Sequence, residues 1–260
     1  MDRDLRRQLV NLVAYLVTVV VNTAAVVLPL NGLTTAEISD RFPALVTPAN
    51  YVFSVWSVIY LLLGAFSVWQ ALPRNRTDRD LRDIGYLPAL AGALNTIWIF
   101  TWHFELFALT VPVMLALLAT LIVIYLRLRP TRTAGGTDRW LVALPFSVYL
   151  GWITVATIAN VSQMLLWAGY DGAPLGAGLW TVIVLGAGVV VTALILLREA
   201  DWAYALVIVW AYVGIAAKQT DTVAVLAAAA GAVIVAILIA VLVVRPWLQR
   251  RGQEDAPAGA

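Results

Sequence analysis

Long apolar runs, separated by short polar segments, make up most of the chain. A helix needs roughly 20 apolar residues to cross about 30 Å of hydrocarbon. Eight runs are near this length: Leu9–Leu28, Asn50–Leu72, Ile84–Trp102, Leu106–Leu126, Trp140–Trp167, Leu175–Leu197, Trp202–Ala217 and Thr222–Val244. Backbone groups in lipid must pair within their own segment, and the alternation typical of a membrane barrel is absent, so the runs are predicted to be helices. We therefore expect an all-α integral membrane protein.

The composition agrees with a chain that has lipid as its main solvent. Hydrophobic residues make up 62% of the 260 positions and charged residues 12%, whereas soluble domains carry about 25% charged residues. There is no cysteine, and His103 is the single histidine. These counts exclude disulfides, thiolate chemistry and histidine-rich metal sites. We expect membrane lipid as the surrounding partner and no nucleic acid.

Basic residues are distributed unevenly among the connections. All of the 17 lysines and arginines except Arg41 and Lys218 precede the first run, lie in alternate connections or follow the last run. Positive residues concentrate on the cytoplasmic side of membranes. The pattern predicts an even number of spans in a prokaryotic cell membrane, with both termini in the cytoplasm.

Ionisable side chains are missing from the middle of every run. Proton pumps and proton-coupled carriers normally need an intramembrane ionisable residue, so ion- or proton-coupled transport is disfavoured. The same absence leaves no general acid or base deep in the bundle. His103 and Glu105 lie in a tight turn between the third and fourth runs, and a short polar turn at the water interface is the favoured interpretation there.

Three of the runs carry aromatic and amide side chains on one helical face. At about 100° per residue, these faces contain Phe53, Trp56, Tyr60 and Gly64; Asn95, Trp98 and Trp102; and Trp152, Ala156, Asn160, Gln163 and Trp167. A buried amide is costly in lipid unless it is hydrogen-bonded, so the faces should point into the bundle. They are expected to line a pocket or to join helices through hydrogen bonds, and the two roles are compatible.

The longest connection on the side opposite the basic residues runs from Pro29 to Thr47. Its Asn31-Gly32 pair predicts a turn. Long loops over compact bundles are often functional, so this connection is either a lid over a pocket or a tolerated surface loop.

Three separated motifs follow one another along the chain. At the start of the second run and just before it, Pro48, Trp56, Tyr60 and Gly64 keep the spacing Pro-Pro-x-Trp-(x)5-Trp-x-x-x-Tyr-x-x-x-Gly. The third run contains Leu94-Asn95-Thr96-Ile97-Trp98, and the fifth contains Tyr149-Leu150-Gly151-Trp152 followed by Asn160. Together these motifs resemble those of the tryptophan-rich sensory proteins of the translocator-protein (TspO/MBR) family.

The resemblance has departures and a limited extent. The family usually has Pro, Trp and Pro at the positions of Thr47, Asn50 and Val148. The expectations drawn from the resemblance are therefore weakest for the loop-side wall of a pocket. The motifs cover roughly residues 5–170. We expect a five-helix TspO/MBR-like bundle at 1–170, about three additional membrane helices at 171–247 and a flexible cytoplasmic tail at 248–260.

The resemblance also implies a function and a set of residues. Such proteins bind tetrapyrroles and other hydrophobic ligands in a pocket under the first loop, and often form homodimers. The ligand-binding residues expected from it are Pro48, Tyr51, Phe53, Trp56, Tyr60, Asn95, Trp98, Trp102, Trp152, Ala156 and Asn160. No cofactor is required, and a porphyrin or haem is expected as a ligand.

With no cysteine and one histidine, a tetrapyrrole would be held by stacking on indoles rather than by strong axial ligation. Three functions remain open. The chain is a ligand-binding sensor or carrier, an enzyme that degrades porphyrins, or an uncoupled transporter whose path the last three helices complete. The residues favour binding over catalysis.

Overall fold

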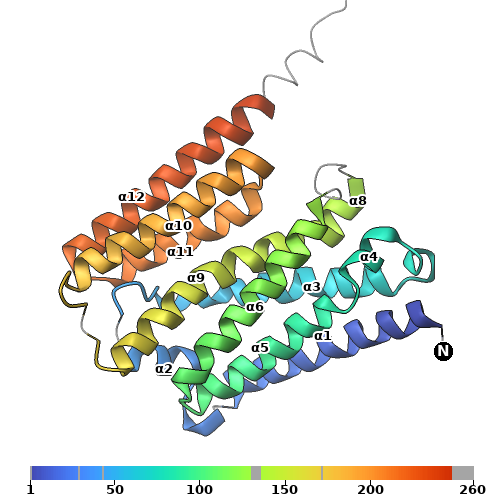
Figure 1. Ribbon diagram of the computed structural model, residues 1–260, viewed down its shortest axis with the longest axis horizontal. Helices are drawn as coiled ribbons and strands as arrows, with labels where there is room; N and C mark the ends of the chain where they lie inside the picture. Colours follow the sequence, from blue (N-terminus) through green and yellow to red (C-terminus); the bar gives the residue numbers. More distant parts are fainter. Residues whose placement is uncertain (1, 29, 43, 130–135, 171, 248–260) are drawn as a thin grey trace, which may run out of the picture.

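The computed structural model describes residues 2–28, 30–42, 44–129, 136–170 and 172–247, and these form helices and connections without any strand (Figure 1). The eight long helices are α1 (Arg3–Val27), α3 (Val55–Ala71), α5 (Leu87–His103), α6 (Phe107–Arg127), α9 (Leu144–Trp167), α10 (Ala177–Glu199), α11 (Trp202–Lys218) and α12 (Thr222–Ile239). The short helices are η1 (Leu30–Gly32), α2 (Thr35–Arg41), η2 (Asn50–Ser54), η3 (Pro73–Asn75), α4 (Arg79–Ile84) and α8 (Gly136–Asp138). Two π-helical segments, η4 (Arg139–Ala143) and η5 (Ala240–Val244), adjoin α9 and α12.

Each of the eight apolar runs forms one long helix, so the expected all-α membrane fold is confirmed. By length and composition, six helical segments within the described residues are suited to cross a membrane, namely those containing α1, α3, α6, α9, α10 and α12. The helices α5 and α11 have 17 residues each. At 1.5 Å per residue such a helix is about 25 Å long, slightly short of the hydrocarbon thickness.

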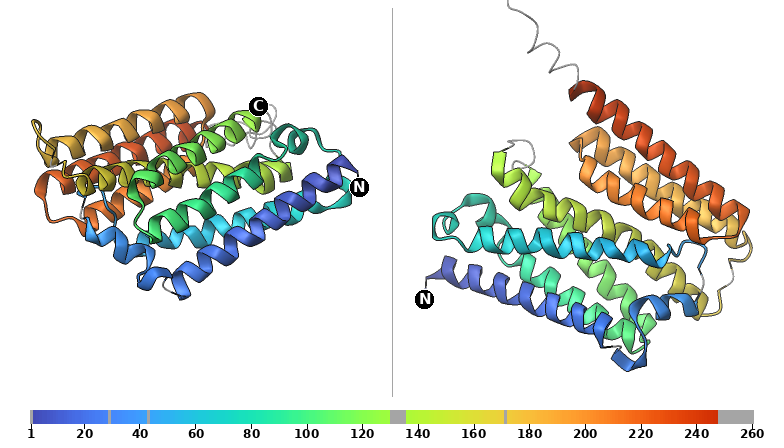
Figure 2. Two further views of the ribbon diagram at one scale, coloured as in Figure 1. Left: turned by 60° about the horizontal axis from the view of Figure 1, so that its bottom comes forward. Right: turned by 180° about the vertical axis from the view of Figure 1, so that it is seen from behind.

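The first five long helices close into a ring. Helix α1 packs on α3 and α5, α5 on α6, α6 on α9, and α9 returns to α3. The last three helices form a separate layer, in which α12 packs on α10 and α11, and α11 docks on the outer side of α9 (Figure 2). The expected five-plus-three arrangement is therefore present, and α9 is the shared wall.

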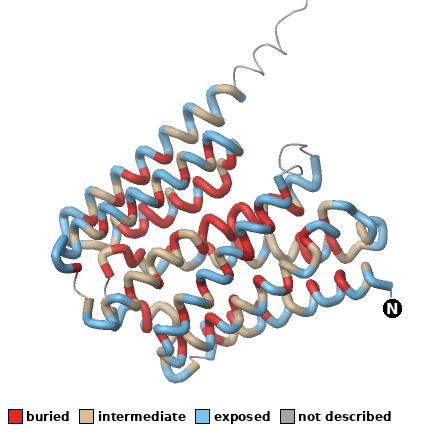
Figure 3. The backbone as a smooth tube through the Cα atoms, in the orientation of Figure 1, coloured by how far each residue is buried: buried red, intermediate tan, exposed pale blue. Residues whose placement is uncertain are grey.

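Burial follows this arrangement. Buried positions concentrate in the interior, with an unbroken buried stretch in the first half of α9 (residues 145–153), whereas outward faces are largely exposed (Figure 3). In an apolar stretch of 18 residues from the segment containing α9, 67% of the residues are buried, whereas 22% are buried in the corresponding stretch of the segment containing α12. Gly151 permits the close packing of α9 on α11, because a Cβ there would lie 3.0 Å from the carbonyl oxygen of Tyr204. The strongly apolar exposed faces are those that lipid would cover.

The two ends of the bundle differ in charge. The N-terminus, α4 and α8 lie at one end, whereas α2 lies at the other (Figure 1). At the first end, Arg82 pairs with Asp4, and Arg127 donates to the carbonyl oxygen of Asp83. The second end contains Arg41 and Lys218. Arg132, Arg250, Arg251 and the predicted tail at 248–260 lie outside the described residues.

Candidate functional site

The connection between α1 and η2 folds over one end of the ring, and we call residues 30–42 and 44–49 the lid. Its centre is the helix α2, which the hydropathy pattern did not predict. A local signal was present, because Thr34 and Glu37 form a capping box. The Thr34 hydroxyl accepts from the Glu37 backbone N–H, and Glu37 Oε2 accepts from the Thr34 N–H at 2.7 Å. Donation from the Thr34 N–H and hydroxyl to the Glu37 carboxylate holds the pKa of Glu37 below its ordinary value.

His103 anchors the lid to the end of α5. Its Nδ1 lies 3.1 Å from the carbonyl oxygen of Leu30, which can only accept, so Nδ1 carries the proton. In the neutral ring, Nε2 then accepts from the Thr35 hydroxyl at 3.0 Å. The amide of Asn31 donates to the His103 carbonyl oxygen at 3.0 Å. His103 is fully buried, so the sequence interpretation of a simple interfacial turn missed its role as a lid anchor.

Two further side chains hold the lid from inside the ring. Gln163 Nε2 donates to both the carbonyl oxygen and the hydroxyl of Ser39, at 2.8 Å each. The indole of Trp102 donates to the Thr35 carbonyl oxygen at 3.2 Å. Gln163 belongs to a predicted stripe, but its pairing with the lid could not be read from helical spacing.

A narrow cavity lies directly beneath the lid, with a volume of ≈ 40 Å³. Eight of the predicted ligand residues line it: Pro48, Phe53, Trp56, Trp98, Trp102, Trp152, Ala156 and Asn160. The same wall contains six residues outside that prediction: Thr35, Ser39, Met114, Val155, Ala159 and Gln163. The three motif-bearing helices therefore meet at one place, together with α6 and the lid.

Indole and phenyl rings make up much of the cavity wall. Trp56 and Trp152 meet edge to face, with ring centroids 6.1 Å apart, and Phe53 contacts Trp152 in the same way at 5.8 Å. Trp98 and Trp102 are stacked on each other at 5.3 Å. Such a wall offers flat apolar surfaces, against which a planar ligand can stack.

Several polar atoms of this wall have no hydrogen-bond partner. The indole N–H groups of Trp98 and Trp152 are buried and unpaired, and so is Oδ1 of Asn160. The amide nitrogen of Asn160 donates to the Thr110 hydroxyl at 2.9 Å, which fixes its orientation. Each unpaired buried group costs about 1–3 kcal/mol, so the wall holds two donors and one acceptor whose hydrogen-bonding capacity is unsatisfied.

Three of the predicted residues lie outside the cavity lining. Tyr51 is 49% exposed and meets Trp210 of α11 edge to face. Tyr60 stacks on Trp56 at 5.4 Å, behind the cavity. Asn95 is fully buried and accepts from the Asn22 amide of α1 at 2.7 Å, so it joins helices. A role in ligand binding remains a prediction for every residue in the set.

The C-terminal layer holds the lid from its outer side. The Ala49 N–H donates to the Gly214 carbonyl oxygen at 3.0 Å, and Gln219 Nε2 donates to the Thr47 carbonyl oxygen at 2.8 Å. Lys218 forms an ion pair with Asp40. Gly214 is required for this approach, because a Cβ there would lie 2.0 Å from a methyl group of Val52 in η2.

A larger cavity, of ≈ 320 Å³, lies on the opposite side of α9. Its walls are the outer face of α9, the start of α10 and lid residues 44–46, and it includes Trp180 and Tyr170. Its serine and threonine hydroxyls donate to carbonyl oxygens of their own helices. This cavity therefore offers a ligand little beyond apolar surface, whereas the cavity beneath the lid offers rings and unpaired polar atoms.

Comparison with known families gives one match over most of the chain. A family model described as "TSPO-like protein" matches residues 8–243. The match extends through α10, α11 and α12, so the family pattern is not confined to residues 5–170 as the motifs alone indicated. Searches of curated proteins and of solved structures gave no match. With its all-α membrane fold and the three motif-bearing helices around one cavity, the chain belongs to the TSPO-like family.

Proposed function

We propose that this TspO-type membrane protein binds tetrapyrroles or related planar hydrophobic molecules in the cavity beneath the lid. The observation that carries the proposal is the convergence of eight predicted residues from the lid, η2, α3, α5 and α9 on one cavity. The helices α3, α5 and α9 are far apart in the sequence, and their aromatic faces meet at this one place. A binding role, as sensor or carrier, follows from this wall.

The chemistry of the wall favours a flat ligand with polar groups at its edge. Stacking on indoles suits an extended π-system. The unpaired N–H groups of Trp98 and Trp152 can donate to a carboxylate or carbonyl oxygen, and Asn160 Oδ1 can accept from a pyrrole N–H. His103 makes contacts to the lid through both ring nitrogens, so axial ligation of a haem iron is disfavoured while the lid is closed.

Ligand entry requires the lid to open. The closed cavity holds ≈ 40 Å³, whereas pockets for drug-sized ligands have volumes of about 300–1,000 Å³. Opening would break the lid contacts made by His103, Trp102 and Gln163 inside and by α11 outside. The C-terminal layer is accordingly proposed to set how readily the pocket opens.

A titration of the detergent-solubilised full chain with protoporphyrin IX, followed by tryptophan fluorescence, tests the binding role. Trp56→Leu should weaken affinity roughly five- to tenfold, because one stacked indole contributes about 1 kcal/mol. The matched control is Trp247→Leu, at the far end of the last helix, which should leave affinity unchanged. Absence of saturable binding by the wild-type chain would contradict the proposal.

The same preparation separates binding from the other two functions. A spectral change without a new product supports binding alone, whereas a light-dependent bilin-like product would assign porphyrin degradation. Accumulation of protoporphyrin inside sealed proteoliposomes would assign transport. Absence of both, with saturable binding, is the expected result.

The orientation in the membrane is proposed from the charge difference between the two ends. We place the N-terminal end, with Arg3, Arg82 and Arg127, in the cytoplasm, because basic residues are retained there. The lid then lies on the opposite side. Reporter fusions after Arg79 should report the cytoplasm and fusions after Asp40 the outside, and a reversed pair of signals would overturn the assignment.

A further inference from the structure

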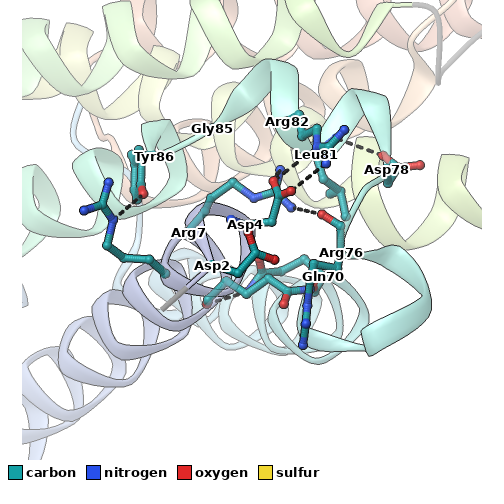
Figure 4. A network of polar contacts seen from close by, with 12 residues as sticks. Asp2, Asp4, Arg7, Gln70, Arg76, Asp78, Leu81, Arg82, Gly85 and Tyr86 are labelled. Atoms are coloured by element: carbon teal, nitrogen blue, oxygen red, sulfur yellow. Dashed lines mark hydrogen bonds and ion pairs between the residues drawn. The ribbon is translucent and has the colours of Figure 1, made fainter.

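A second polar site lies at the N-terminal end of the bundle, far from the lid. A cavity of ≈ 440 Å³ lies there between the start of α1 and the connection from α3 to α5. Figure 4 shows the polar contacts among side chains around it. Its lining residues are Arg3, Asp4, Arg7, Arg82, Gly85 and Tyr86. None of them belongs to the family motifs or to the pocket beneath the lid.

Arg7 is the unusual member of this lining. It is 4% exposed, and its Nη2 donates to the Arg76 carbonyl oxygen at 2.8 Å. Nη1 lies 3.6 Å from Oδ1 of Asp4, and neither Nη1 nor Nε makes a hydrogen bond. A guanidinium has five N–H donors, so most of the donors of this buried cation are unused. Burying a cation in this state is costly unless a further acceptor approaches.

The charges of the lining favour an anion. Three arginines surround the cavity, and Asp4 is the one acidic residue in the lining. Asp4 is already engaged by Arg82, whose Nε and Nη2 donate to its two oxygens at 3.1 and 2.5 Å. A net positive cavity remains, and planar guanidinium groups match the oxygens of phosphate in geometry and charge.

The position of the cavity favours a lipid headgroup as the source of such a phosphate. It lies where α1 leaves the apolar part of the bundle, which is the depth of lipid headgroups under the topology given above. Val10 and Val17 follow Arg3 at intervals of seven residues, so they lie below it on one side of α1, and they are 41% and 49% exposed. An acyl chain can pack on this face while its headgroup enters the cavity.

We propose that this cavity binds the phosphate of an anionic phospholipid headgroup, with the acyl chains lying along the exposed face of α1. The phosphate oxygens accept hydrogen bonds from Arg3, Arg7 and Arg82. Because Arg7 already bonds the Arg76 carbonyl, the bound lipid ties the start of α1 to the connection before α5. Basic pockets at the cytoplasmic ends of membrane helices are suited to such headgroups.

Thermal unfolding and native mass spectrometry of the full chain in detergent test this site. Added phosphatidylglycerol should raise the unfolding temperature and remain bound in the gas phase, whereas phosphatidylcholine with the same acyl chains should do neither. Arg3→Gln and Arg82→Gln should each raise about tenfold the phosphatidylglycerol concentration needed for the same rise in unfolding temperature, because each removes a charge-assisted hydrogen bond. Arg3 is exposed at the first helical residue, so its variant keeps the fold.

The matched control is Arg79→Gln, which removes the same charge at the same end of the bundle. The Arg79 side chain is 92% exposed and lies outside the cavity lining, so its variant should respond to phosphatidylglycerol like the wild type. An equal response to phosphatidylcholine, or an equal loss in Arg79→Gln, would overturn the proposal in favour of general surface adsorption. Equal protection by millimolar inorganic phosphate without lipid would show that the cavity takes a soluble anion, and would overturn the assignment to a lipid.

Discussion

Substitution of His103 by alanine tests the role of the lid separately from that of the pocket wall, because His103 holds the lid without lining the cavity beneath it. The change removes two hydrogen bonds, one to the Leu30 carbonyl oxygen and one to the Thr35 hydroxyl. Each neutral bond contributes about 1 kcal/mol, so the closed lid should lose ~2 kcal/mol relative to the open lid. At 1.4 kcal/mol per factor of ten, the open fraction should rise roughly thirtyfold.

The assay is stopped-flow quenching of tryptophan fluorescence after mixing with protoporphyrin IX. If the ligand enters through the open lid, the association rate scales with the open fraction while that fraction is small. His103→Ala should therefore bind up to roughly thirtyfold faster than the wild type. Size-exclusion chromatography of the variant checks that it stays monodisperse.

Arg41→Ala provides the comparison. It also removes a lid contact, the ion pair with Glu105, but the Arg41 side chain is 50% exposed. Exposed pairs contribute about 0–1 kcal/mol, so the association rate should change by less than about fivefold. An unchanged rate in His103→Ala, or equal acceleration in both variants, would refute the reasoning that His103 keeps the pocket closed.

Three further predictions concern the lid and the ring. Gly214→Ala should lower the unfolding temperature in detergent and loosen the lid, since the added Cβ overlaps η2 and such overpacking costs about 1–3 kcal/mol. Asn95→Leu should destabilise the chain by about 1–3 kcal/mol, measured by thermal unfolding in detergent, because one N–H of the buried Asn22 amide loses its acceptor while the other still donates to the Thr18 carbonyl oxygen. The pKa of Glu37 is lowered by the bonds from Thr34 at the start of α2, so its contribution to the stability of α2 is present above its ordinary value of 4.5 and is lost as the pH falls through the lowered value. The unfolding temperature in detergent should fall on acidification through this range in the wild type, and Glu37→Gln should lack that part of the fall.

The helices and their inward faces could be predicted from the sequence, because hydropathy and helical spacing are local properties. The stripe of Trp152, Ala156 and Asn160 does line the cavity for this reason. Which residues a stripe contacts depends on the order of the helices around the ring. The spacing of residues along one helix gives no information about that order. For this reason the sequence predicted neither the bond between Asn95 and Asn22, which comes from a run without a stripe, nor the outward turn of Tyr51 toward α11.

The lid and the C-terminal layer illustrate a second limit. The helix α2 had a readable signal in Thr34 and Glu37, and hydropathy concealed it because the helix is short and polar. The hydrogen bonds that join Gly214 of α11 and the adjoining Gln219 to the lid left no such signal, since each uses a backbone carbonyl oxygen and any sequence supplies those groups. The need for a glycine at position 214 can be recognised only once Val52 is known to lie against it.

The central claim is that the ligand lies beneath the lid rather than in the larger cavity outside α9. The most direct measurement is the dissociation constant of protoporphyrin IX for Trp152→Leu beside that for Trp180→Leu, which line the inner and outer cavities respectively. Trp152 should contribute about 1 kcal/mol by stacking and ~1 kcal/mol through its indole N–H, so its loss should weaken binding roughly thirtyfold. Trp180→Leu should bind as the wild type does. Weakened binding in Trp180→Leu with normal binding in Trp152→Leu would contradict the account and move the site to the outer cavity.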